Sequence, residues 1–90
     1  MSVKINIPPF LVHLANETQI AVVEGTTIDD CLKEFGKRFP NTRKLLFDDE
    51  GKLREYIDVY LNGKSIYLEG LSKLVADGDE LDVLFVITGG

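Results

Sequence analysis

The chain has 90 residues, of which 44% are hydrophobic and 28% charged, and its formal net charge is −5. This length suits one small domain with a single core, and the composition excludes a disordered chain. The acidic balance argues against nucleic acid as a partner, because phosphate binding requires clustered lysines and arginines. We therefore expect residues 1–90 to form one domain whose partners are proteins with basic surfaces.

Neither a membrane segment nor a metal site is predicted. No apolar run approaches the ~20 residues that a membrane-spanning helix needs, and residues 1–4 do not resemble the start of a secretory signal. The one cysteine, Cys31, and the one histidine, His13, are too few to bind zinc. We expect a cytoplasmic protein that contacts no membrane and holds no metal.

Two strands are predicted before the first helix. Residues 3–7 alternate between apolar and polar side chains, which is typical of a half-buried strand that ends at Pro8-Pro9. After an irregular stretch over residues 10–14 and a turn at residues 15–17, residues 19–24 are rich in β-branched side chains. They predict a second strand, antiparallel to the first.

The clearest helix signal starts at Thr27. This residue is the expected N-cap, and Asp30 is placed to complete a capping box. Pro40 should end the helix. The apolar stripe of the helix consists of Ile28, Cys31, Leu32, Phe35 and Phe39. Because Cys31 belongs to this stripe, we interpret it as a buried hydrophobic residue; the alternative is a reactive thiol.

The second half of the chain predicts three further strands. After a polar connection over residues 41–55, residues 57–61 alternate and lead into Asn62-Gly63, a strong hairpin signal, and a short return strand at residues 65–67. A crossing segment and an acidic turn at residues 77–80 precede the last strand, residues 81–87. The order β-β-α-β-β-β predicts an α+β fold with one main helix across a mixed sheet.

The last strand carries apolar side chains on both faces. Asp82 marks the solvent face, so Leu81 and Val83 should face the core, whereas Leu84 and Val86 should point outward. One interpretation is a docking surface for a partner. Tyrosines 56, 60 and 67 would extend either this surface or the core. The alternative is that strand twist or the loop around Phe10 covers Leu84 and Val86. The acidic turn before this strand is interpreted either as a steering charge or as an ordinary solvated turn.

The chain stops at Thr88-Gly89-Gly90. Glycine allows the backbone to approach another molecule closely, so residues 87–90 are expected to form a protruding tail that enters a narrow slot. On this interpretation a partner uses the Gly90 carboxylate. The alternative is a frayed end without a role.

Taken together, the element order, the Asn62-Gly63 hairpin, the acidic turn at 77–80 and the terminal Gly89-Gly90 resemble the ubiquitin-like sulfur carriers of the MoaD and ThiS family. The stretch 56–63, followed by Ile66 and Gly70-Leu71, is similar to the small subunit of molybdopterin synthase in particular. The chain departs from the family where a proline often precedes the tail, since residues 85–87 are Phe-Val-Ile. The resemblance implies a β-grasp fold.

The resemblance also implies a carrier and not an enzyme. Gly90 would be adenylated by an activating enzyme that uses ATP, converted to a thiocarboxylate with sulfur from a cysteine desulfurase or a rhodanese-type donor, and used by a large synthase subunit, most simply in molybdopterin or tungstopterin synthesis. Leu84, Val86 and Ile87 would bind the partners, and Thr88 and Gly89 would lead Gly90 to the active site. The chain has no P-loop, Gly-x-Gly-x-x-Gly or His-paired nucleophile, so no cofactor is expected on it.

Three alternatives remain open at this point. In the first, the chain is a sulfur carrier whose acceptor is thiamine thiazole, a cysteine precursor or a tRNA base. In the second, Gly90 is joined to lysines, which makes the chain a protein modifier. In the third, the chain is a plain interaction domain whose terminal glycines are incidental. The state of Gly90 in cells separates the carrier from the modifier.

Overall fold

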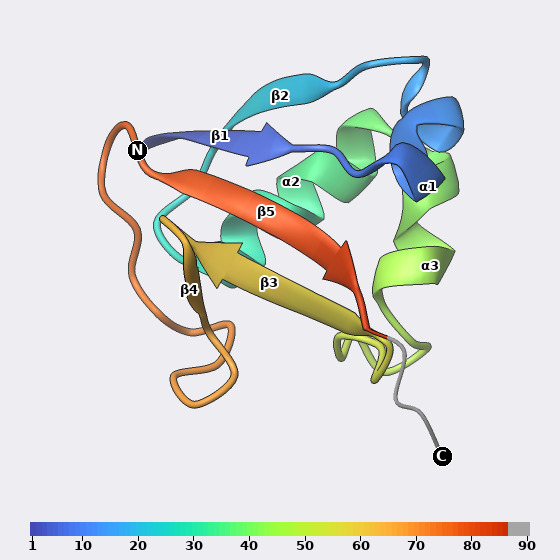
Figure 1. The fold of residues 1–90 in the computed structure, drawn as a ribbon. Coiled ribbons are helices and arrows are strands. Elements are labelled where there is room, and N and C mark those ends of the chain that lie inside the picture. The colour runs from blue at the N-terminus through green and yellow to red at the C-terminus, as the bar shows by residue number, and fades with distance from the viewer. Residues whose placement is uncertain (87–90) are drawn as a thin grey trace.

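The computed structural model describes residues 1–86 and contains a five-stranded mixed sheet with its main helix on one face (Figure 1). The strands are β1 Ser2–Asn6, β2 Ile20–Glu24, β3 Ile57–Leu61, β4 Lys64–Ser65 and β5 Glu80–Phe85. The helices are α1 Pro9–Val12, α2 Ile28–Arg38 and α3 Arg43–Leu46, and two 3-10 turns are η1 His13–Ala15 and η2 Pro40–Thr42. The α+β architecture predicted from the sequence is confirmed.

The sheet has the strand order β2-β1-β5-β3-β4. β1 pairs antiparallel with β2 and parallel with β5, and β3 pairs antiparallel with β5 and with β4. At the centre, Leu81 on β5 is aligned with Ile5 on β1 and with Leu61 on β3. Ile5 and Leu81 are completely buried under α2, so the parallel pair lies at the middle of the core.

Helix α2 begins and ends as the sequence predicts. The Thr27 hydroxyl accepts a hydrogen bond from the Asp30 backbone N–H at 3.1 Å, and the Asp30 carboxylate accepts one from the Thr27 N–H at 3.3 Å. This reciprocal pair satisfies N–H groups that have no partner inside the helix. The buried residues of α2 are Ile28, Cys31, Leu32, Phe35 and Gly36.

Two segments expected to be irregular contain helical turns. In the stretch 10–14, α1 and η1 form because Pro9 occupies the first turn, where a missing N–H costs nothing, and Leu11 is completely buried. Within residues 41–55, α3 packs Leu46 into the core, and the buried Thr42 hydroxyl donates to the Phe39 carbonyl at 2.7 Å. In each segment, burial of an apolar side chain stabilises a turn that the sequence pattern did not predict.

The last two strands differ in length from the prediction. β4 ends at Ser65, so Tyr67 lies beyond it and is 85% exposed. β5 starts at Glu80, which the sequence placed in a turn, and ends at Phe85. Val86 still donates its backbone N–H to the Tyr56 carbonyl at 2.7 Å. The part of the predicted strand that includes Ile87 lies outside the described residues.

Replacement of Cys31 by serine tests the interpretation of this residue as part of the core. Cys31 is completely buried, and burial is the main cause that raises the pKa of its thiol. A buried hydroxyl is more costly than a thiol, so Cys31→Ser should lower the free energy of unfolding by about 1–3 kcal/mol in chemical denaturation. Cys31→Ala serves as the control for lost volume. A serine variant as stable as the wild type would contradict the buried placement.

Candidate functional site

The candidate site lies at the C-terminal end of β5. Leu81 and Val83 on this strand are at most 1% exposed, whereas Leu84 is 41% and Val86 is 36% exposed. The predicted register of the strand is therefore confirmed for these four residues. Ile87, Thr88, Gly89 and Gly90 lie outside the described residues.

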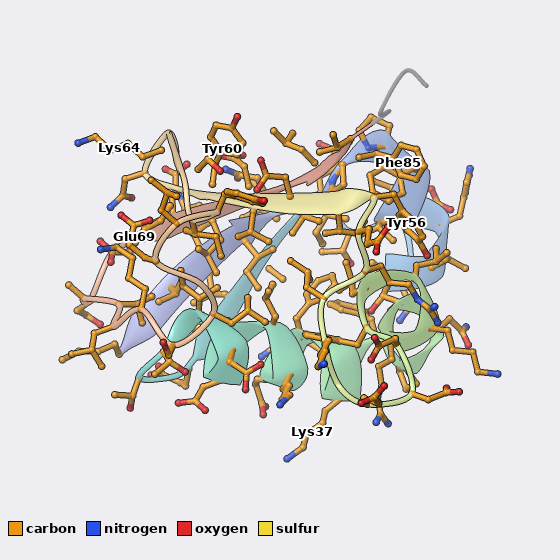
Figure 2. All side chains as sticks on the ribbon, turned by 90° about the horizontal axis from the view of Figure 1, so that it is seen from below. Lys37, Tyr56, Tyr60, Lys64, Glu69 and Phe85 are labelled. Carbon is orange, nitrogen blue, oxygen red and sulfur yellow. The ribbon has the colours of Figure 1, made fainter. Side chains whose placement is uncertain are left out.

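Leu84 belongs to the sheet face that α2 does not cover, which we call the open face. Leu84 is aligned with Asp58 on β3, and Asp82 with Tyr60. Figure 2 shows Tyr60 on the side of the sheet opposite to α2. Towards β2, the open face continues over the exposed side chains of Ile20 and Val22.

A hydrogen-bonded amide orders the acidic groups at the centre of the open face. The Asn6 side-chain N–H groups donate to Glu80 Oε2 and to Asp82 Oδ1, each at 2.9 Å. Lys4 approaches the other oxygen of Glu80 at 4.0 Å. The amide therefore bridges the two carboxylates and fixes their positions on the face that also carries Leu84. This arrangement suits a partner that presents basic groups around an apolar contact.

Phe85 is a site residue that the sequence did not reveal. Strand alternation places it on the same face as Leu81 and Val83, yet it is 52% exposed because it lies at the end of the sheet. Its ring contacts Phe10 edge-on and Tyr56 at a tilt, both with centroids 5.3 Å apart. Figure 2 shows Tyr56 and Phe85 together at this end of β3 and β5. Aromatic residues at such spacing commonly anchor protein contacts.

The Phe10 segment does not cover the outward residues of β5. Phe10 contacts the ring of Phe85, while Leu84 and Val86 stay exposed. The covering alternative raised by the sequence is therefore wrong for this loop. We call the exposed set Phe10, Leu84, Phe85 and Val86 the β5-end patch.

The acidic turn lies at the other end of β5. Asp79 accepts hydrogen bonds from the Ala76 backbone N–H at 2.7 Å and from the Asn62 side chain at 3.0 Å. Asp77 accepts one from the Ser2 backbone N–H at 2.7 Å. The six-residue strand β5 separates this turn from Val86 by about 20 Å, which exceeds the screening length of about 8 Å in physiological salt by a factor of about 2.5. Asp77 and Asp79 thus form a structural junction between β1, the hairpin and β5, which supports the solvated-turn interpretation for these two residues, whereas Glu80 lies on the open face.

The comparison with known proteins identifies the family. The profile of the ThiS family matches residues 5–90. The chain belongs to the ThiS family. The sulfur carrier protein CysO of Mycobacterium tuberculosis is 26% identical over 94 residues, and the alignment covers 100% of both chains. The resemblance to the ubiquitin-like sulfur carriers is confirmed at the level of the family.

Solved structures of this family share the fold of the chain. The small archaeal modifier protein SAMP1 of Methanosarcina acetivorans is 29% identical with a TM-score of 0.86, and the match covers 99% of this chain and 96% of that one. A chain in the BexX/CysO complex of Amycolatopsis orientalis is 28% identical with a TM-score of 0.87, covering 98% and 99%. The predicted ubiquitin-like β-grasp fold is confirmed.

Two further observations concern residues 1–86. Within this part of the chain, no three His, Cys, Asp or Glu side chains gather in a way that could hold a metal ion. None of the helices described there has the length and hydropathy needed to cross a bilayer.

Stability should depend on pH through Asp79. Its hydrogen bond from the Ala76 N–H, followed by that from Asn62, lowers its pKa below the ordinary 3.8. A carboxylate with a lowered folded-state pKa stabilises the fold above its unfolded pKa, and this contribution is lost as the pH falls through the folded value. Asp79→Ala should therefore destabilise the protein at about pH 7 and lose most of this effect at about pH 2.

Urea denaturation at both pH values measures this difference. Glu69→Ala serves as the control, since Glu69 is exposed and takes no part in the hydrogen bonds of the turn. An Asp79→Ala effect that is equal at both pH values would contradict the proposed role of the charged carboxylate.

Proposed function

We propose that this protein is a sulfur carrier whose Gly90 carboxylate is adenylated by a partner enzyme and then converted to a thiocarboxylate. The observation that supports this most directly is the β5-end patch, because three of its four exposed apolar side chains, those of residues 84–86, directly precede the predicted tail 87–90 in the sequence. Membership of the ThiS family supports the same chemistry. The patch and the open face would bind the activating enzyme while Gly90 enters its active site.

The chemistry explains why the carrier depends on partners. A terminal carboxyl group has a pKa near ~3.5, so at neutral pH it is an anion that resists nucleophiles. Attack of this carboxylate on the α-phosphorus of ATP forms an acyl-adenylate and releases pyrophosphate. A persulfide anion on a donor protein then attacks the acyl carbon and displaces AMP. A second thiol of the donor breaks the resulting acyl disulfide, which leaves the thiocarboxylate on Gly90 and a disulfide on the donor.

The sulfur acceptor is assigned to a cysteine precursor in this proposal. The sequence alone favoured a pterin acceptor, with a cysteine precursor among the alternatives. The curated relatives named CysO cover the whole chain at 26% identity and favour the cysteine precursor as the first acceptor to test. A molybdopterin or tungstopterin precursor remains the second acceptor to test.

Intact mass spectrometry tests the thiocarboxylate directly. After incubation with the activating enzyme, ATP and a persulfide donor, the protein should gain the mass difference of one sulfur for one oxygen. Deletion of Gly90, or addition of one residue after it, should abolish both this gain and ATP–pyrophosphate exchange without changing the melting temperature. A partner that binds the carrier but catalyses no exchange would contradict the proposal.

A second candidate function is conjugation to lysine through Gly90. It is favoured by the 29% identity to SAMP1, whose name describes a modifier protein. The same adenylate would then be attacked by a lysine amine, and AMP would again leave. Trypsin cleaves last after Lys73, so peptides from cells that carry residues 74–90 on a lysine side chain would support the modifier, whereas a free thiocarboxylate supports the carrier.

Leu84→Asp should weaken binding of the activating enzyme. Leu84 is an exposed apolar residue at the proposed contact, and a new carboxylate there must lose its water on binding. We expect a loss of at least about tenfold in affinity by calorimetry, which corresponds to about 1.4 kcal/mol, with an unchanged melting temperature.

The neighbouring residue provides the matched control. Val83 is 1% exposed, so Val83→Asp places an unpaired charge in the core and should unfold the domain. If Leu84→Asp binds the enzyme as tightly as the wild type, the docking role of this patch is wrong.

A further inference from the structure

A basic cleft opens on the helical side of the molecule, away from the open face. Its volume is about 590 Å³, which is within the usual range of small-ligand sites. Helix α2 contributes Lys33 and Lys37, α3 contributes Arg43 and Lys44, and Arg54 closes the cleft from the following segment. In Figure 2, Lys37 points away from the sheet, on the side opposite to Tyr60.

The lining of the cleft reverses the charge balance of the chain. Five of the ten lysine and arginine residues line it, but only two of the fifteen acidic residues do so. One of these two, Asp48, accepts hydrogen bonds from the backbone N–H groups of Glu50 and Lys52, each at 2.9 Å. These two hydrogen bonds stabilise the Asp48 carboxylate within its own turn. The cleft is a local positive site on an acidic protein.

Arg54 is fixed in position before any ligand binds. Its Nε–H donates to the Lys44 carbonyl at 2.9 Å, and its backbone N–H donates to the Leu46 carbonyl at 2.9 Å. These bonds attach the segment after α3 to α3 itself. Within residues 1–86, the terminal nitrogens of this guanidinium have no hydrogen-bond partner, so they are available to an anion.

A glycine in α2 makes room for Arg43. A Cβ atom at Gly36 would lie 2.7 Å from Arg43 Cγ, so any larger residue would displace the arginine stem. Glycine in a helix interior costs about 1 kcal/mol relative to alanine. At this buried position it allows the stem of Arg43 to lie directly on α2 beside the cleft.

Most of the cationic groups of the cleft form no ion pair within residues 1–86. Lys33 forms an ion pair with Asp29 at 2.8 Å. In the part of the chain that the structure describes, no ion pair involves Lys37, Arg43, Lys44 or Arg54. Four like charges around one cleft repel each other, and an anion bound between them would relieve that repulsion.

We propose that this cleft binds a small polyphosphate, either inorganic or the triphosphate of a nucleotide. Two arginine guanidiniums offer paired N–H groups that match phosphate oxygens, and the lysines add charge on the same walls. Linked phosphates extend further than a single phosphate, so we expect them to contact more of these walls at once. A nucleic acid strand is disfavoured because the rest of the chain is strongly acidic. This proposal is independent of the sulfur chemistry at Gly90.

Titration of the isotope-labelled full chain by NMR tests the proposal. The probes are tripolyphosphate, ATP, AMP and orthophosphate, without any partner enzyme. Tripolyphosphate should cause saturable amide shifts confined to residues 33–54, with an affinity at least about tenfold higher than that of orthophosphate. If ATP binds with the same affinity as tripolyphosphate, the cleft recognises the phosphates alone. If ATP binds more tightly than tripolyphosphate, the cleft also recognises the nucleoside. Both results support the proposal.

Matched double variants establish that the cleft is the site. Lys37→Gln with Arg43→Gln removes two charges from the cleft, and Lys4→Gln with Lys64→Gln removes two charges elsewhere. The first pair should weaken tripolyphosphate binding at least about tenfold, and the second less than about twofold. Equal losses in both pairs, absence of saturable shifts in the wild type, or tighter binding of a poly-glutamate peptide than of tripolyphosphate would overturn the proposal.

Discussion

The parallel pairing of β1 with β5 is the contact on which the rest of the structure depends. It joins residues near the two ends of the chain, with Ile5 aligned with Leu81 and both side chains completely buried. Two hydrogen bonds at one end of this pair fix its register. The Gly78 N–H donates to the Ser2 carbonyl, and the Lys4 N–H donates to the Asp79 carbonyl. β2 then extends the sheet next to β1, β3 extends it next to β5, and α2 covers one face (Figure 1). The direction in which the chain leaves β5 is a consequence of this register.

Features that depend on neighbouring residues were predicted well. The capping box of Thr27 and Asp30 involves residues three positions apart, so the sequence contains the whole signal. The alternation of Leu81, Val83 and Leu84 also follows from one strand alone, because side chains change face at every residue. The partner-binding role of Leu84 and Val86 and the chemistry of Gly90 stay predictions.

Features that depend on distant contacts were not predictable in the same way. Phe85 has the alternation of a core residue, and its exposure follows from the sheet ending beside α1. The helical turn containing Leu11 forms because the core accepts that leucine, which no local pattern shows. The basic cleft had a visible signal in the many lysines and arginines between residues 33 and 54, but only the fold brings α2, α3 and Arg54 around one space.

Charge is divided between two opposite sides of this small molecule. Asn6 holds the carboxylates of Glu80 and Asp82 on the open face, and the cations of the cleft lie beyond α2 on the other side. Taken by themselves, these two groups of charges form an electric dipole across the sheet. If the proposed activating enzyme presents a basic surface, its field exerts a torque on this dipole and turns the open face towards it during diffusion. The orientation of the collision is then selected before any apolar side chain makes contact.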